Sequence, residues 1–170
     1  MPSQNFFAGV DLGGTKINVT VLGEDGTFRI SEMMESPSLV EQGPAVTLKH
    51  MEIALQQAAD LAGIDLRSLR GVGLDTPGPA SADGVISAQG STNFGNSDWA
   101  RFPIREAFQK VIGLPTVYAN DGNAAAFHCH RVKFGEDVKS SSMTAAVGTG
   151  LGGGIVVNGP ELRHARLISA

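Results

Sequence analysis

The sequence predicts an α/β fold. Segments with the apolar or alternating pattern of β-strands alternate with segments whose apolar residues recur at helical spacing, which indicates this class. Near each end of the chain, an apolar strand runs into a glycine-rich turn and then into another strand, so a strand–turn–strand unit is repeated. Of the 170 residues, 42% are hydrophobic, which is enough for a buried core and excludes global disorder.

Charge, hydropathy and cysteine content exclude several classes of protein. The 13 Lys and Arg against 17 Asp and Glu give a net charge of -4, which lacks the basic surface that nucleic-acid binding needs. No apolar run approaches the ~20 residues of a membrane span, and the N-terminus does not resemble a signal peptide. The single Cys129 excludes an internal disulfide framework. We therefore expect a cytoplasmic protein with no nucleic-acid partner and no membrane partner.

The N-terminal segment predicts a meander of three strands. Residues 6–12 form an apolar run, which is typical of a buried strand, and the run ends at a pair of glycines. Alternating apolar residues predict a second strand over 16–22, closed by a turn at 23–26. A third strand is expected over 27–33.

A helix and a short strand follow. The helix begins at Pro44, and Gly63 is a natural C-terminal stop. Its apolar stripe consists of Leu48, Met51, Leu55, Ala58 and Ala62. Val72 and Leu74 then indicate a short strand before the turn-rich segment 75–79.

The remaining elements repeat the alternation. The polar segment 81–99 is expected to be a loop, and Pro103 suits the first position of a helix with Ile104, Ala107, Phe108 and Val111 on one face. A strand over 116–119 leads into a helix over about 122–134. The last two strands, 142–147 and 155–157, are joined by a run in which five of seven residues are glycine.

The first glycine turn has the groups that bind a phosphate. Glycines let backbone N–H groups approach a ligand closely, so we predict Gly13 and Gly14 as phosphate ligands, with the hydroxyl of Thr15 and the ammonium of Lys16. Asp11, at the strand end, is suited to bind a magnesium ion through water. The alternative is an ordinary hairpin whose glycines serve only the turn.

Two better-known phosphate loops are excluded, because both must open into a helix. The alternating residues after Lys16 continue as a strand. Gly148, Gly150 and Gly153 match the dinucleotide-binding spacing Gly-x-Gly-x-x-Gly, but β-branched residues 155–157 again predict a strand. A phosphate-binding hairpin remains.

Asp121 is the candidate general base. It lies where a strand ends and a helix begins, which is the usual place for active sites in α/β proteins. The alternative is a helix N-cap, a position that Asp and Asn both favour. Asn120 would offer its amide to ligand hydroxyls, or would cap the same helix.

The loop over 93–99 has side chains suited to a sugar. Amides and carboxylates of Asn93, Asn96 and Asp98 can pair with vicinal hydroxyls, and Trp99 can pack on a sugar face. The alternative is a solvated turn with Trp99 anchored in the core.

His128 and His130 suggest a metal site by composition alone. Alternate residues of a helix point about 200° apart, however, so the two side chains cannot easily share one ion. We expect both on a surface helix.

Four motifs, taken in order, resemble those of the ROK family of bacterial sugar kinases and related repressors, within the actin-like ATPase superfamily. They are Asp11-Leu-Gly-Gly-Thr-Lys16, Pro77-Gly-Pro79, Asn120-Asp-Gly-Asn-Ala-Ala125 and Gly148-Thr-Gly-Leu-Gly-Gly-Gly154, and the resemblance covers about residues 6–160. It implies a ribonuclease H-like lobe with a mixed sheet over residues 1–119 and the beginning of a second lobe over 120–170. It also implies ATP between the lobes and a sugar in the cleft.

The resemblance assigns roles by motif position. Asp121 resembles the catalytic base, and Asn120 and Gly78 resemble ligands of the sugar. The positions that resemble phosphate-loop residues are Asp11, Gly13, Gly14 and Thr15 in the first loop, with Thr149 and Gly150 in the second. We therefore expect ATP-dependent phosphorylation of a hexose, such as glucose at its 6-hydroxyl, with magnesium, by a protein that is a homodimer at full length.

The tail departs from the family pattern. Family members continue into a Gly-x-x-Gly-x-Ala-Gly-Glu-x-Gly-His segment, whereas Gly159 is followed here by Pro-Glu-Leu-Arg-His and six further residues. His164 therefore cannot be equated with the family histidine, and we expect a truncation or a shifted reading frame. Two alternatives to a kinase stay open: an inactive fragment, and a sugar sensor of the regulator branch, although the DNA-binding helix pair of that branch is absent.

Overall fold

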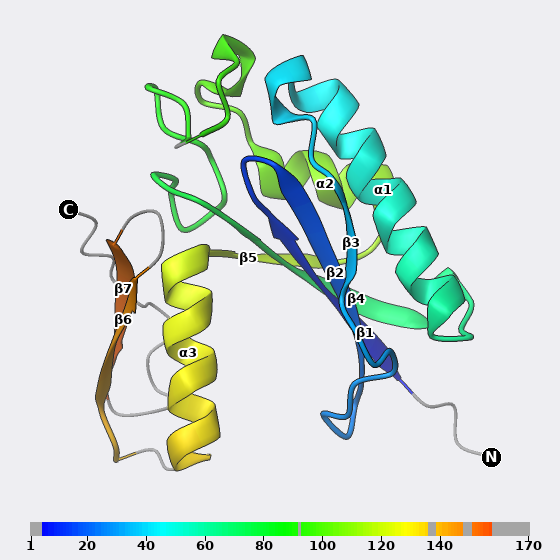
Figure 1. Ribbon diagram of the computed structural model, residues 1–170, viewed down its shortest axis with the longest axis vertical. Helices are drawn as coiled ribbons and strands as arrows, with labels where there is room; N and C mark the ends of the chain where they lie inside the picture. The colour runs from blue at the N-terminus through cyan, green and yellow to red at the C-terminus, as the bar shows by residue number, and fades with distance from the viewer. Residues whose placement is uncertain (1–4, 92, 136–138, 148–150, 158–170) are drawn as a thin grey trace. The chain divides into compact units, whose positions relative to one another are not determined.

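The computed structural model describes residues 5–91, 93–135, 139–147 and 151–157 (Figure 1). The chain divides into two compact units, residues 1–118 and 119–170. No described helix is both long and apolar enough to cross a membrane.

A five-stranded mixed sheet forms the centre of the first unit. Its strands are β1 (Phe6–Leu12), β2 (Lys16–Gly23), β3 (Met34–Pro37), β4 (Leu69–Thr76) and β5 (Thr116–Asn120), in the order β3-β2-β1-β4-β5. β1 pairs antiparallel with β2 and parallel with β4, and β2 pairs antiparallel with β3. The predicted α/β class with a mixed sheet is therefore confirmed.

Two helices cover the core side of this sheet. α1 (Pro44–Leu61) packs against β1, β2 and β3, and α2 (Ile104–Ile112) packs against α1 (Figure 1). Leu48, Met51, Leu55 and Ala58 of the predicted stripe are buried, whereas Ala62 is partly buried and caps the end of α1. Gly63 follows with the left-handed φ of 67° that favours glycine. In α2, Ile104 and Phe108 are buried as predicted, but Val111 is 41% exposed.

The third strand lies later than predicted. It spans Met34–Pro37, while residues 27–33 form bends with one bridge between Phe28 and Leu22. The reason is local, because the Asp25 carboxylate accepts hydrogen bonds from the backbone N–H and the hydroxyl of Thr27 and competes with strand pairing. These bonds from Thr27, more than the nearby Arg29, hold the pKa of Asp25 below its ordinary value.

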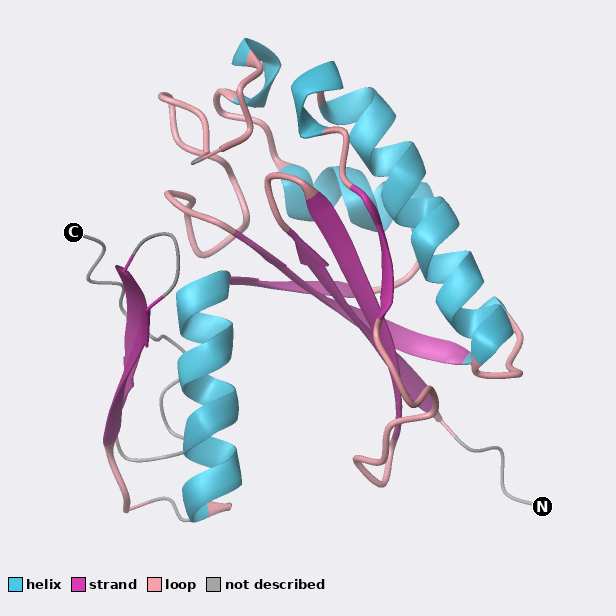
Figure 2. Ribbon diagram, in the orientation of Figure 1, coloured by secondary structure: helices cyan, strands magenta, loops and turns pink. Residues whose placement is uncertain are grey.

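The segment after β4 is mostly loop, as predicted (Figure 2). Its described residues include a 3-10 turn over Ser97–Trp99. Trp99 is fully buried, and its indole N–H donates to the carbonyl oxygen of Val40 at 2.8 Å. The rings of Phe94 and Phe102 pack against it at 4.7 and 5.4 Å between centroids. The core alternative for Trp99 is therefore correct, and the interpretation of this ring as a platform for a sugar is wrong.

Among the described residues of the second unit, a helix packs on a hairpin. α3 (Asp121–Phe134) packs against the antiparallel pair β6 (Ser142–Val147) and β7 (Leu151–Val156). The strand β7 begins earlier than the predicted 155–157, because three of the glycines assigned to a turn lie within it. A Cβ at Gly154 would come within 2.8 Å of the Ala126 Cβ on α3. These glycines allow the helix to pack closely on the strand.

The two histidines of α3 lie on opposite sides, as helical geometry requires. His128 is exposed, whereas His130 is 2% exposed, and its Nδ1 lies 2.8 Å from the hydroxyl of Ser142 on β6. The expectation of a surface position is therefore wrong for His130. Within the described ranges, no three metal-ligating side chains gather.

Candidate active site

Asp11 lies at the carboxyl end of β1 and is half-buried. The side-chain amide of Asn18 donates to its Oδ2 at 3.0 Å. On the other side, β4 places Asp75 as its direct parallel neighbour. Carboxylate oxygens are the ligands that magnesium prefers, so this strand end fits the ion predicted for Asp11. The amino-acid sequence alone does not indicate Asp75, because its proximity to Asp11 depends on the pairing of two strands far apart in the chain.

The turn after β1 presents unused backbone donors. The Gly13 N–H donates to the Lys16 carbonyl at 2.8 Å, and the Ser38 N–H donates to the Thr15 carbonyl at 3.0 Å. Within the described part of the chain, the N–H groups of Gly14 and Thr15 have no hydrogen-bond partner. Backbone amides of this kind can bind phosphate oxygens.

Lys16 pairs with Glu35 on the neighbouring strand, at 2.7 Å between Nζ and Oε1. Both side chains are more than half exposed, at 56% and 51%. An exposed pair of this type contributes only ~0–1 kcal/mol, so it offers little resistance to an anionic ligand that competes for the ammonium.

The loop with the predicted sugar ligands reaches the same turn. Asn93 is exposed, and its Cβ lies only 2.7 Å from where a Cβ on Gly14 would be. Two residues earlier, the Ser91 hydroxyl donates to the Pro77 carbonyl at 2.7 Å, which ties this loop to the one that carries Gly78. The structure thus brings Gly14 and Asn93 together. It also links the loop of Asn93 to the segment around Gly78.

Asn96 has local partners. Its Oδ1 accepts from the Asp98 N–H at 2.8 Å, and its Nδ2 donates to the Glu41 carbonyl at 3.1 Å. These bonds cap the 3-10 turn and favour a structural role. Its role as a sugar ligand stays a prediction.

Asn120 and Asp121 share the start of α3. Asn120 is the N-cap and is 7% exposed, and its Oδ1 accepts from the Gly122 N–H at 3.1 Å. Asp121 is exposed, and its Oδ1 accepts from the same N–H at 2.6 Å. Among the described residues, its Oδ2 has no partner. Because Asn120 holds the cap position, one oxygen of Asp121 is available for other chemistry. Thr149 and Gly150, predicted for the second phosphate loop, lie outside the described residues.

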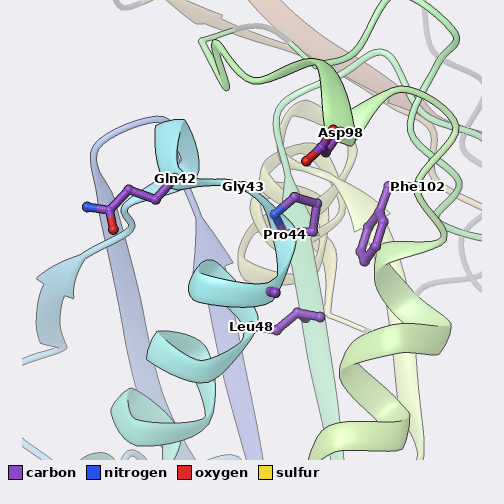
Figure 3. A pocket seen from close by; sticks show the side chains of 7 residues that line it. Gln42, Gly43, Pro44, Leu48, Asp98 and Phe102 are labelled. Atoms are coloured by element: carbon purple, nitrogen blue, oxygen red, sulfur yellow. The ribbon is translucent and has the colours of Figure 1, made fainter.

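A pocket of about 400 Å³ lies at the start of α1 (Figure 3). Its walls are mainly apolar, with Pro44 and Leu48 on α1 and Phe102 on the later loop. The remaining lining residues are Gln42, Gly43, Ala45 and Asp98. Of these residues, only Asp98 is among the side chains that the sequence predicts for the sugar.

Comparison with known proteins identifies relatives over most of the chain. The ROK family model matches residues 7–164. The chain is 32% identical over 158 residues to a glucokinase of Streptomyces coelicolor, an alignment that covers 92% of this chain and 44% of the relative. It is 29% identical over 154 residues to an N-acetylmannosamine kinase of Salmonella paratyphi B, covering 90% and 48%. The chain therefore spans about half the length of the curated relatives it matches.

Solved structures agree with these matches. A ROK hexokinase from Thermus thermophilus superimposes with a TM-score of 0.71 at 30% identity, covering 97% of this chain and 48% of that one. A ROK glucokinase from Streptomyces griseus, solved with glucose and AMPPNP, gives a TM-score of 0.66 at 28% identity and covers 95% and 46%. Because the family model matches residues 7–164 of its 170 residues, this chain belongs to the ROK family.

Proposed function

We propose that the full-length protein transfers the γ-phosphoryl group of ATP to a hydroxyl of a hexose. The observation that carries this proposal is the exposed Asp121 at the start of α3, with Asn120 as cap and one carboxylate oxygen without a partner among the described residues. Such a carboxylate can accept the hydroxyl proton as the sugar oxygen attacks phosphorus. The kinase activities in the names of the relatives support this assignment.

Each remaining residue has a positioning role in this proposal. The N–H groups of Gly14 and Thr15, the Thr15 hydroxyl and the Lys16 ammonium bind phosphate oxygens, with Gly13 closing their turn. Asp11 would hold a magnesium ion through water, and the ion would supply positive charge that offsets the charge of the phosphates. Phosphoryl transfer depends mainly on positioning and charge stabilisation, and these groups can provide both. Thr149 and Gly150 complete the proposed phosphate ligands.

For the sugar, we propose Gly78, Asn93, Asn96 and Asn120 as ligands and glucose as the first substrate to test. Relatives named as glucokinase and as N-acetylmannosamine kinase both support a hexose. Because the donor is ATP, we propose a cytoplasmic location.

The full-length protein with ATP and magnesium is expected to phosphorylate glucose or N-acetylmannosamine at an ordinary enzyme rate of ~10 s⁻¹. A coupled assay that detects ADP, run with each sugar separately, measures this. Calorimetry on the same preparation provides the control for binding. Sugar binding without turnover would contradict the kinase proposal and would favour a sugar sensor.

Replacing Asp11 with asparagine is expected to raise the magnesium concentration needed for half-maximal rate by about 10- to 100-fold, the usual cost of losing an outer-shell carboxylate. The amide keeps the hydrogen-bonding shape but loses the negative charge. The assay is a magnesium titration at saturating ATP and sugar. Asp83→Asn, which changes an exposed loop carboxylate, is the matched control. An unchanged magnesium requirement in Asp11→Asn would remove the metal assignment.

A further inference from the structure

Gly14 has no conformational reason to be glycine. Neither Gly13 nor Gly14 adopts the left-handed φ that excludes other residues, although eight other glycines of the described chain do. The requirement at these two positions must therefore come from what lies beside the missing side chain.

The two glycines differ in that respect. A Cβ on Gly13 would meet only the Lys16 carbonyl of its own hairpin, at 3.3 Å. A Cβ on Gly14 would meet the Cβ of Asn93 at 2.7 Å and its carbonyl oxygen at 3.0 Å. The first is a small adjustment within a turn, and the second is a collision with a loop that lies far along the sequence.

The loop that carries Asn93 cannot easily withdraw. On its N-terminal side, the Ser91 hydroxyl holds the Pro77 carbonyl at 2.7 Å. On its C-terminal side, Phe94 is 1% exposed and packs on Trp99. Asn93 itself has a φ of 69°, a conformation that Asn tolerates better than most residues. The backbone of Asn93 is thus held at both ends against the face of Gly14.

We propose that Gly14 is a positioning residue for the sugar, which acts by seating Asn93, and that its own side-chain-free face is not reserved for phosphate. This inference rests on the proposed function. Its consequence is that the turn over residues 13–15 sets the position of Asn93, which binds the sugar, before any nucleotide binds. A side chain at Gly14 would displace Asn93 while leaving the Gly14 N–H in place.

The test is the binding of sugar to the full-length protein in the absence of nucleotide, measured by calorimetry with the hexose that the wild type phosphorylates. Gly14→Ala is expected to weaken this binding by about 10- to 100-fold, the cost of misplacing a ligand by about an ångström. The KM for ATP should change much less. Gly13→Ala is the matched variant in the same turn, and it should affect the KM for ATP rather than sugar binding.

Other outcomes are equally informative. Unchanged sugar binding with weakened ATP binding in folded Gly14→Ala would overturn the positioning role but leave the kinase proposal intact. A wild type that binds no hexose and shows no turnover would overturn both. If Gly14→Ala does not fold, adding Asn93→Gly removes the closer of the two contacts, the Cβ at 2.7 Å, and leaves the carbonyl oxygen at 3.0 Å. The double variant should therefore recover at least part of the cooperative thermal transition. Failure of that suppression would also overturn the inference.

Discussion

Replacement of Asp121 with asparagine is expected to lower kcat of the full-length protein by ~100-fold or more, the usual contribution of a general base. Asparagine is nearly isosteric and can still accept the Gly122 N–H that Asp121 Oδ1 accepts at 2.6 Å. Asn120 remains as the N-cap. The variant therefore removes the proton acceptor while it retains the start of α3. Steady-state rates of sugar phosphorylation measure the effect, with circular dichroism to verify the fold.

Asp65→Asn is the control for this experiment. Like Asp121, Asp65 is an exposed carboxylate at the start of a helix, where its Oδ1 accepts from the Arg67 N–H at 2.8 Å. The same substitution there should leave kcat unchanged, because it alters a cap without altering the proposed site. Near-normal turnover in Asp121→Asn would reduce Asp121 to a structural role.

Truncation of Trp99 to alanine is expected to lower the free energy of unfolding by ~3–5 kcal/mol, as for other fully buried large side chains. That is a large fraction of the ~5–15 kcal/mol typical of a whole domain, roughly a fifth or more. The substitution removes an indole with no exposed surface and one of the two hydrogen bonds to the Val40 carbonyl, which keeps the Gly43 N–H as donor at 3.1 Å. Chemical denaturation of the full-length protein, followed by circular dichroism, measures the loss.

Two comparison variants separate the contributions. Trp99→Phe retains most of the buried ring and loses mainly the bond to Val40, so it should cost less than the alanine variant. Phe28→Ala removes an aromatic side chain that is 64% exposed and should change stability by no more than ~0.5 kcal/mol. Equal stability of Trp99→Ala and Phe28→Ala would contradict the core assignment.

The candidate site was predictable from sequence where its geometry is local. Asp121 follows a strand and starts a helix, and both elements are legible in the apolar pattern around it. The turn over residues 13–15 joins two adjacent strands, so its position at the end of β1 also follows from the chain itself. Residue types alone could not show whether Asn120 or Asp121 caps the helix, because Asn and Asp both favour the N-cap position. The structure assigns the cap to Asn120.

The other features of the site could not be predicted, because they depend on contacts between residues far apart in the sequence. Asp75 lies beside Asp11 only because β4 pairs parallel with β1, and a parallel pairing cannot be read from either strand. The contact between Gly14 and Asn93 depends on the path of a long loop that has little periodicity. Trp99 is polar at one edge and apolar elsewhere, so burial or exposure was decided by the carbonyl of Val40 and the neighbouring rings.

The glycines show most clearly which features the sequence determines and which depend on the tertiary structure. By itself, the sequence determined the class of fold, most of its elements and the strand–helix junction at Asp121, because periodicity and turn chemistry act over a few neighbouring residues. It could not determine why each glycine is glycine. Gly63 is favoured by its own left-handed φ. Gly14 is favoured by its close approach to Asn93, and Gly154 by its close approach to Ala126 on α3. Only the tertiary structure decided the last two, because close packing is set by atoms that the chain brings together from distant positions.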